Sequence, residues 1–173
     1  YFHLLFHYSY VSLFHNVFLY YISIMFHNYI IHNNIIYFLH NFTMKYLVVG
    51  GGGFIGSYIV DKLIKEDEVS EVIVYDNFCS GKKWHLDQHK VNSKLTLIEK
   101  DIYDDDLFEH LKNIDVTIML AANADIAAAI SNPQIDFDQG THLLQIVLEA
   151  MRRGGCNKLL YASGSGVYGE TGY

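Results

Sequence analysis

From Met44 onward, short apolar runs alternate with longer amphipathic stretches, and this alternation constrains the fold more than any other feature of the chain. The apolar runs have the length and composition of buried strands. They lie at 46–49, 71–75, 95–98, 116–120 and 158–162. Strands that alternate with helices predict a parallel sheet with helices on both faces. The sequence therefore predicts a doubly wound α/β domain over residues 44–173.

Two of the amphipathic stretches are regular enough to predict which face of a helix is buried. After the first strand, the predicted apolar face holds Ile55, Ile59, Val60, Leu63 and Ile64. Before the fifth strand, the predicted apolar face holds Leu144, Val147, Leu148 and Met151. Each of these faces is expected to pack against the sheet.

Four consecutive glycines stand between the first strand and the first helix, within the sequence V-G-G-G-G-F-I-G. We expect Gly50 to make a tight turn, Gly53 to let the backbone approach a pyrophosphate, and Gly56 to let the helix pack closely on the strand. The helix N-terminus, near Phe54 and Ile55, would offer free N–H groups to phosphate oxygens. A glycine run alone is also typical of a flexible turn, so a second feature is needed to distinguish a dinucleotide-binding loop from such a turn.

Asp76 is that second feature, because it ends the second predicted strand 20 residues after Gly56. A carboxylate at this point accepts hydrogen bonds from the adenosine ribose hydroxyls of a dinucleotide. It would also repel the additional phosphate of NADP. The loop and the carboxylate together predict a Rossmann-type domain that binds NAD.

The first 43 residues have a composition of their own, without any Lys, Arg, Asp or Glu. Three interpretations stay open: translated upstream sequence, a membrane-associated helix, and a structured extension. The longest stretch free of His and Asn, 17–26, is ten residues long, about half of the roughly 20 apolar residues that span a bilayer. We favour translated upstream sequence with a start at Met44, and we expect residues 1–43 to lie outside the domain.

Charge and cysteine content exclude several classes of partner. The formal net charge is −7, and the Lys82-Lys83 pair is too short to provide the basic surface that nucleic acids require. Cys79 and Cys156 form no C-x-x-C pair, which is typical of a protein in a reducing cytoplasm and gives no sign of a zinc site. We therefore predict a cytoplasmic protein that binds neither nucleic acid, nor membrane, nor metal.

Five motifs, in this order along the chain, resemble those of one known family. They are G-G-G-G-F-I-G at 50–56, D-N-F-C-S-G-K at 76–82, K-D-I at 100–102, L-A-A-N-A-D at 120–125 and Y-A-S-G-S-G-V-Y-G-E at 161–170. From Met44 to Glu170 the chain resembles the extended short-chain dehydrogenases. Within these it is most similar to the NAD-dependent epimerase/dehydratase family, which acts on nucleotide sugars and includes UDP-glucose 4-epimerase.

The resemblance implies cofactor contacts after the second, third and fourth strands. They are Asp76 and Asn77 at the adenosine ribose, Asp101 and Ile102 at the adenine, and Leu120, Ala121 and Ala122 along the dinucleotide. From the spacing alone, the two alanines are better explained by ordinary packing between a strand and a helix.

The chain departs from the family at the catalytic positions. Family members use a Tyr-x-x-x-Lys pair after the fifth strand, whose phenolate takes a proton from a sugar hydroxyl while hydride passes to NAD. The sole Tyr-x-x-x-Lys here is 58–62, inside the first helix, and we interpret it as a chance match. The family's Ser or Thr is replaced by Gly164, so Ser163 and Ser165 are the candidate catalytic hydroxyls. The family's usual Asn is replaced by Gly140.

Two functions of different classes therefore stay open. The first is an NAD-dependent nucleotide-sugar epimerase or dehydratase, of which this chain is the cofactor-binding part. The second is a family member that binds NAD without catalysis, which Gly140 and Gly164 favour. We favour the enzyme, but we expect the 173-residue chain itself to be inactive because the catalytic pair is missing. Family members are often homodimers, so the resemblance also implies a homodimer.

Overall fold

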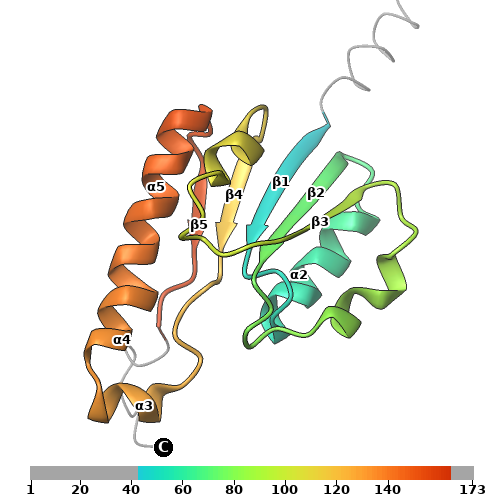
Figure 1. The fold of residues 1–173 in the computed structure, drawn as a ribbon. Coiled ribbons are helices and arrows are strands. Elements are labelled where there is room, and N and C mark those ends of the chain that lie inside the picture. The colour runs from blue at the N-terminus through green and yellow to red at the C-terminus, as the bar shows by residue number, and fades with distance from the viewer. Residues whose placement is uncertain (1–42, 165–173) are drawn as a thin grey trace, which may run out of the picture. The chain divides into compact units, whose positions relative to one another are not determined.

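The structure is a computed structural model that describes residues 43–164. These residues form a five-stranded sheet in the order β3-β2-β1-β4-β5, with all neighbouring strands parallel (Figure 1). The strands are β1 (Met44–Val49), β2 (Val69–Asp76), β3 (Leu95–Glu99), β4 (Val116–Met119) and β5 (Leu159–Tyr161). The strand β1 is central, with β2 and then β3 on one side of it and β4 and then β5 on the other. The predicted doubly wound, Rossmann-type fold is confirmed.

Helical segments connect these strands. The α-helices are α2 (Phe54–Lys65), α3 (Ile126–Ser131), α4 (Gln134–Asp136) and α5 (Leu143–Gly154). Two 3₁₀ segments, η1 (Lys83–His89) and η2 (Leu107–Leu111), flank β3, and a π-helical segment, η3 (Phe137–His142), joins α4 to α5. The predicted exclusion of residues 1–43 from the domain concerns a segment almost wholly outside the described residues, and it stays a prediction.

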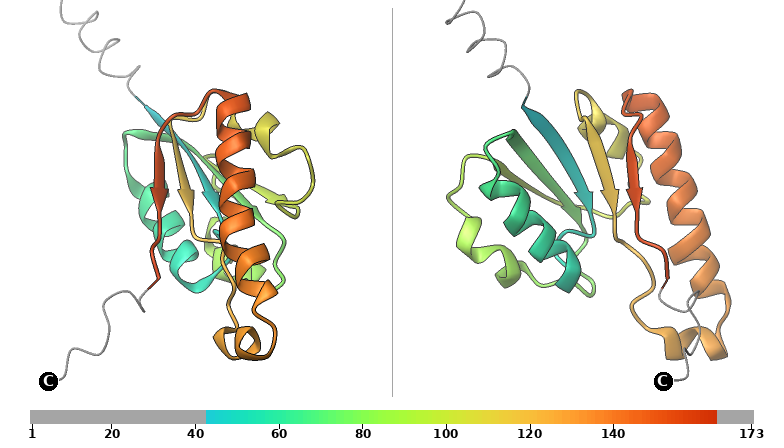
Figure 2. Two further views of the ribbon diagram at one scale, coloured as in Figure 1. Left: turned by 90° about the vertical axis from the view of Figure 1, so that its left-hand side faces the viewer. Right: turned by 180° about the vertical axis from the view of Figure 1, so that it is seen from behind.

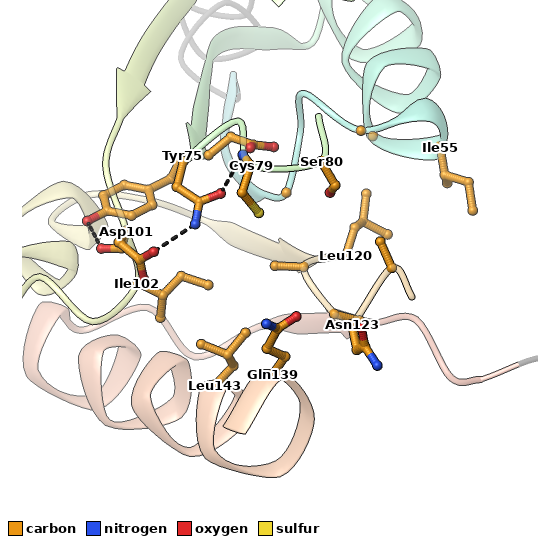
Figure 3. A pocket seen from close by; sticks show the side chains of 18 of the residues that line it. Ile55, Tyr75, Cys79, Ser80, Asp101, Ile102, Leu120, Asn123, Gln139 and Leu143 are labelled. Carbon is orange, nitrogen blue, oxygen red and sulfur yellow. Dashed lines mark hydrogen bonds between the residues drawn. The ribbon is translucent and has the colours of Figure 1, made fainter. Parts of the chain in front are cut away.

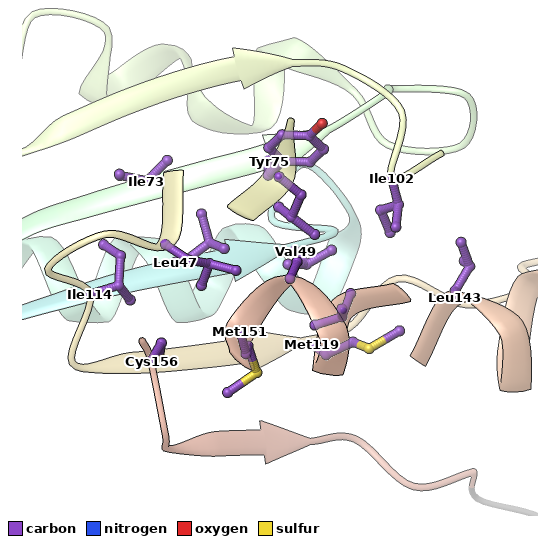
Figure 4. Packing of buried hydrophobic residues seen from close by; sticks show 14 residues of the cluster. Leu47, Val49, Ile73, Tyr75, Ile102, Ile114, Met119, Leu143, Met151 and Cys156 are labelled. Carbon is purple, nitrogen blue, oxygen red and sulfur yellow. The ribbon is translucent and has the colours of Figure 1, made fainter. Parts of the chain in front are cut away.

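The helices α2 and α5 cover opposite faces of the sheet (Figure 2). Consecutive strand residues point to opposite faces, so β1 contributes to two separate apolar clusters. Leu47 and Val49 belong to the cluster beneath α5 (Figure 4), whereas Val48 belongs to the cluster beneath α2. All three side chains are fully buried. The burial of each contributes roughly 1.5–3 kcal/mol, which holds β1 and the loop that follows it in place.

The buried face of α2 differs from the predicted one, and Ile55 does not belong to it. The exposed fraction of Ile55 is 64%, whereas Gly56, Val60 and Ile64 are buried. The reason lies at Gly56, which approaches the backbone of the preceding loop and therefore faces inward. Residues four and eight positions later lie on the same face, while Ile55 is rotated about 100° away from it.

The buried face of α5 also differs, because Leu148 has an exposed fraction of 46%. The buried residues of this helix are Leu143, Val147, Ala150 and Met151. A spacing of four, three and one residues places them on one stripe. The prediction included the larger Leu148 and overlooked Ala150, which is buried in the cluster beneath this helix.

Gly140, in the middle of η3, gives a first testable prediction. A Cβ added there would meet no atom within 4 Å, and glycine inside a helix is less favourable than alanine by about 0.5–1 kcal/mol. We therefore expect Gly140→Ala to raise the free energy of unfolding, measured with urea, by about that amount. A decrease would show that the π-helical turn requires glycine.

Candidate functional site

A cavity of about 440 Å³ opens at the carboxyl ends of the strands (Figure 3). In a parallel sheet these ends meet at one edge, and a crevice forms where the strand order changes direction. Here that point lies between β1 and β4. The volume is within the range of roughly 300–1,000 Å³ that is usual for small-molecule sites.

The structure brings together all twelve residues predicted to bind the cofactor. The cavity lining includes Gly50, Gly53, Phe54, Ile55, Gly56, Asp76, Asn77, Asp101, Ile102, Leu120, Ala121 and Ala122. They come from four loops that are distant in the sequence, so the parallel sheet is what unites them. Their individual roles as cofactor contacts stay predictions.

Ten further lining residues were not predicted. They are Tyr75, Cys79, Ser80, Lys100, Tyr103, Asn123, Ala124, Gln139, Leu143 and Ala162. Eight of them lie within the motifs that carry the family resemblance or directly beside them, so they could have been predicted from these motifs. Gln139 and Leu143 come from η3 and the start of α5, and only the folded chain places them there (Figure 3).

Of the two candidate catalytic hydroxyls, the structure describes only Ser163. Ser163 is exposed after β5 and does not line the cavity, although its neighbour Ala162 does. Ser165 lies outside the described residues. Tyr58 and Lys62 line a groove beside α2 instead, and Tyr58 is exposed.

Two glycines of the loop are required by close backbone contacts. Gly50 has a φ of +81°, which L-residues rarely adopt, and a Cβ there would lie 2.6 Å from the backbone nitrogen of Ala121. A Cβ on Gly56 would lie 2.4 Å from the carbonyl oxygen of Gly50. At Gly53 the nearest atom would be 3.4 Å away, so this glycine leaves open space at the cavity wall.

Gly52 is held through both its N–H and its carbonyl group. Its N–H donates to Asp76 Oδ2 at 2.8 Å, while Asp76 Oδ1 accepts from the N–H of Phe78 at 2.7 Å. The carbonyl oxygen of Gly52 accepts from the N–H of Lys82 at 3.0 Å and contacts His85 Nδ1 at 2.9 Å. Because a carbonyl only accepts, His85 Nδ1 carries the hydrogen. Asp76 thus fixes the glycine loop as well as facing the cavity, a role that the sequence did not reveal.

Asp101 is held by a second group of hydrogen bonds. Its Oδ2 accepts from Asn77 Nδ2 at 2.7 Å and its Oδ1 accepts from the N–H of Tyr103 at 3.0 Å. The Tyr75 hydroxyl lies 3.0 Å from the carbonyl oxygen of Asp101 and 2.9 Å from Asp106 Oδ1. Burial, and next the adjacent Asp106 carboxylate, raise the pKa of Tyr75 above its ordinary value, so this hydroxyl stays protonated at neutral pH.

Lys100 and Asp106 form an ion pair beside this network. The hydrogen bond from Lys100 lowers the pKa of Asp106, and the same bond raises the pKa of Lys100. Asp106 is therefore ionised at neutral pH and accepts hydrogen bonds from both Lys100 and Tyr75.

The chemistry of this lining fits a dinucleotide. The glycine loop leaves room that side chains would fill, and the N-terminus of α2 directs N–H groups there, as anions require. Carboxylate and amide groups lie at the ends of β2 and β3, where Asp76, Asn77 and Asp101 line the cavity. Leu120 and Ala121 supply an apolar wall. The lining thus holds both the polar groups that a phosphate and a ribose require and the apolar surface that a base requires.

Within residues 43–164, no three acidic, histidine or cysteine side chains gather closely enough to hold a metal ion. No helix in this same part of the chain has the length and apolar character needed to cross a membrane.

Comparisons with known proteins agree with this geometry. A protein from Methanocaldococcus jannaschii, provisionally assigned as a UDP-glucose 4-epimerase, is 39% identical over 130 residues. That match covers 73% of this chain and 40% of the relative. A UDP-glucose 4-epimerase from Halalkalibacterium halodurans is 33% identical over 133 residues, which cover 73% of this chain and 36% of that enzyme.

Solved structures show the same likeness. The UDP-N-acetylglucosamine 4-epimerase from Methanobrevibacter ruminantium, in complex with UDP-N-acetylmuramic acid, superposes with a TM-score of 0.66 at 34% identity. The match covers 75% of this chain and 41% of that one. The UDP-glucuronic acid 4-epimerase from Bacillus cereus, in complex with UDP-glucuronic acid and NAD, gives a TM-score of 0.67 at 30% identity, with 75% and 43% covered.

The chain thus spans about 40% of the length of the curated relatives that it matches. A family-wide sequence model, described as the NAD dependent epimerase/dehydratase family, matches residues 46–173. This range contains the sheet except for the first two residues of β1, the glycine loop and every residue that lines the cavity. The chain belongs to the NAD-dependent epimerase/dehydratase family.

Proposed function

We propose that the chain binds NAD in this cavity and forms the cofactor-binding part of a nucleotide-sugar epimerase or dehydratase. The observation that carries the proposal is the meeting of the glycine loop, Asp76 and Asp101 around one cavity. When bound, NAD supplies a reversible acceptor for a hydride. The substrate class is a UDP-sugar, since the similar enzymes named above act on sugars of this kind.

Each part of the lining has a role in this proposal. The N–H groups at Phe54 and Ile55 bind the pyrophosphate, where the helix N-terminus favours negative charge. Asp76 accepts hydrogen bonds from the ribose hydroxyls and disfavours a phosphate in their place. Asn77 contacts the same ribose as Asp76, and Asp101 and Ile102 contact the adenine. Further along the dinucleotide, the contacts come from Leu120, Ala121 and Ala122.

A non-catalytic NAD-binding module is the second candidate. The observation that favours it is the surroundings of the fifth strand: Gly164 provides no hydroxyl, and Ser163 does not line the cavity. On either proposal we expect the 173-residue chain to bind NAD without turnover, because no Tyr-x-x-x-Lys pair reaches the cavity within the described residues. A cytoplasmic location and a homodimer belong to the same proposal and follow from the cysteine content and the family resemblance.

Titration calorimetry with the 173-residue chain tests the proposal. We expect NAD to bind at least tenfold more tightly than NADP, because the carboxylate of Asp76 would face the additional phosphate. We expect no conversion of UDP-glucose to UDP-galactose and no NADH absorbance when UDP-glucose is added to the NAD-loaded chain. Equal affinity for both dinucleotides, or no binding of NAD, would contradict the cofactor assignment, and detectable turnover would contradict the predicted inactivity.

A further inference from the structure

We propose that Tyr75 is a positioning residue for the adenine end of the cavity, and that its hydroxyl acts by holding Asp101. The proposal rests on the proposed binding of NAD and adds a residue that none of the recognised motifs contains. It concerns a side chain whose ring lies in the core and whose hydroxyl reaches the site.

The ring of Tyr75 is anchored in the sheet. Tyr75 is the last residue but one of β2, its exposed fraction is 0%, and it belongs to the apolar cluster beneath α5 (Figure 4). Its hydroxyl points to the segment after β3, where it meets the carbonyl oxygen of Asp101 (Figure 3). A rigid strand is thereby connected to a loop that lines the cavity.

The other hydrogen bonds to Asp101 come from less firmly held groups. Asn77 and Tyr103 are exposed, and so is Asp104, which accepts from the N–H of Asp101 at 3.2 Å and donates its own N–H to the Asp101 carbonyl oxygen at 3.0 Å. The loop is also held beside Asp101, by the backbone bond from Lys100 to Asp76 and by the buried Ile102. Among the residues that bond directly to Asp101 in the described part of the chain, Tyr75 alone is fully buried.

The packing of β2 does not itself require a hydroxyl. Phenylalanine would fill nearly the same volume without a polar group to satisfy, and the preceding residues, Val72, Ile73 and Val74, are wholly apolar. A buried hydroxyl must find a partner, and here both partners, Asp101 and Asp106, belong to the loop. We therefore explain the presence of a tyrosine rather than a phenylalanine at this position by the hydrogen bonds of its hydroxyl to Asp101 and Asp106.

Tyr75→Phe removes this connection and keeps the ring. Asp106 keeps its ion pair with Lys100, so no buried carboxylate loses its last partner. Asp101 loses its hydrogen bond to the buried Tyr75 hydroxyl, while the N–H of Lys100 keeps its bond to the carbonyl oxygen of Asp76. We expect the dissociation constants of NAD and of AMP to rise by the same factor, about threefold to tenfold, which is the range given by one ordinary hydrogen bond.

A double-mutant cycle on the 173-residue chain tests the route through Asp101. Calorimetry with NAD and with AMP would compare the wild type, Tyr75→Phe, Asp101→Ala and the double variant. In the Asp101→Ala background we expect Tyr75→Phe to change affinity by less than twofold, because the carboxylate that it positions is gone. Tyr46→Phe is the matched control. It removes a hydroxyl from β1, on the α2 side of the sheet, and should leave both affinities unchanged.

The outcomes separate the two proposals. If the wild type binds NAD and Tyr75→Phe binds it equally well, the role of Tyr75 is refuted while NAD binding stands. If Tyr75→Phe raised the dissociation constants by the same factor in the wild-type and Asp101→Ala backgrounds, the role would also be refuted, because the hydroxyl would then act independently of the Asp101 carboxylate. A loss for NAD but not for AMP would contradict the assignment to the adenine end. If the wild type binds no NAD, the proposed function fails and this inference fails with it.

Discussion

Replacing Gly56 by alanine is expected to abolish measurable NAD binding and to lower the free energy of unfolding by about 1–3 kcal/mol, the usual effect of overpacking. The added Cβ would lie 2.4 Å from the carbonyl oxygen of Gly50 and 2.7 Å from the Cα of Gly51. Both are backbone atoms, so no rotamer change relieves the contact. The helix α2 must move away from the loop, and its N-terminus then leaves the position proposed for the pyrophosphate.

Gly53→Ala is the matched control for this variant. The same methyl group would there meet a single atom, the carbonyl oxygen of Gly50, at an ordinary distance of 3.4 Å, and its φ of −71° suits alanine. We expect a change in stability below about 1 kcal/mol and a loss of NAD affinity, because the methyl group occupies the cavity wall. Urea denaturation followed by circular dichroism, together with calorimetry, measures both quantities. Wild-type stability of Gly56→Ala would show that the loop and helix separate easily.

Asp76→Ala is expected to weaken NAD binding by at least about a hundredfold and also to destabilise the fold. Two charge-assisted hydrogen bonds to the ribose would be lost, at about 1.5–3 kcal/mol each, and 1.4 kcal/mol corresponds to a tenfold change. In the protein itself, the N–H groups of Gly52 and Phe78 lose their acceptor. Gly52 is buried, so leaving its N–H unpaired costs about 1–3 kcal/mol.

Two further variants separate the effects at Asp76. Asp67→Ala removes a carboxylate from an exposed position just before β2, and we expect it to change neither NAD affinity nor stability appreciably. Asp76→Asn keeps the shape and one acceptor, so its stability should lie between those of the wild type and Asp76→Ala. The preference for NAD over NADP should shrink in both Asp76 variants. An undiminished preference would mean that another group excludes the phosphate.

The sequence predicted the positions of the five strands because each holds a short, mostly apolar run, although β3 and β5 are only partly buried. The predicted 116–120 is one residue longer than β4 at one end, and the predicted 158–162 is one residue longer than β5 at each end. The cofactor loop could be recognised from its glycine spacing, although only Gly56 is required by contacts that are local in the chain, whereas Gly50 meets the distant backbone of Ala121. The order of the strands, β3-β2-β1-β4-β5, was not predicted and comes from the structure.

Contacts between segments distant in the sequence escaped prediction. Gly52 lies among the quoted glycines, yet its bond to Asp76 crosses 24 residues. Gln139 reaches the cavity from a π-helical turn, which no hydrophobic period indicates. In α2 the prediction was wrong only at Ile55, because a contact of Gly56 sets the rotation of the helix, whereas the other four predicted residues lie in or against the apolar cluster.

The double attachment of Gly52 has a consequence for the rate of cofactor binding. Its N–H and carbonyl groups are engaged by the protein itself, so the loop is already ordered before any ligand arrives. Fixing the backbone of one residue costs about 1–2 kcal/mol of conformational entropy, and here that loss accompanies folding instead of association. A preorganised loop needs no closing step, so the dinucleotide should bind in a single kinetic phase whose rate rises linearly with ligand concentration.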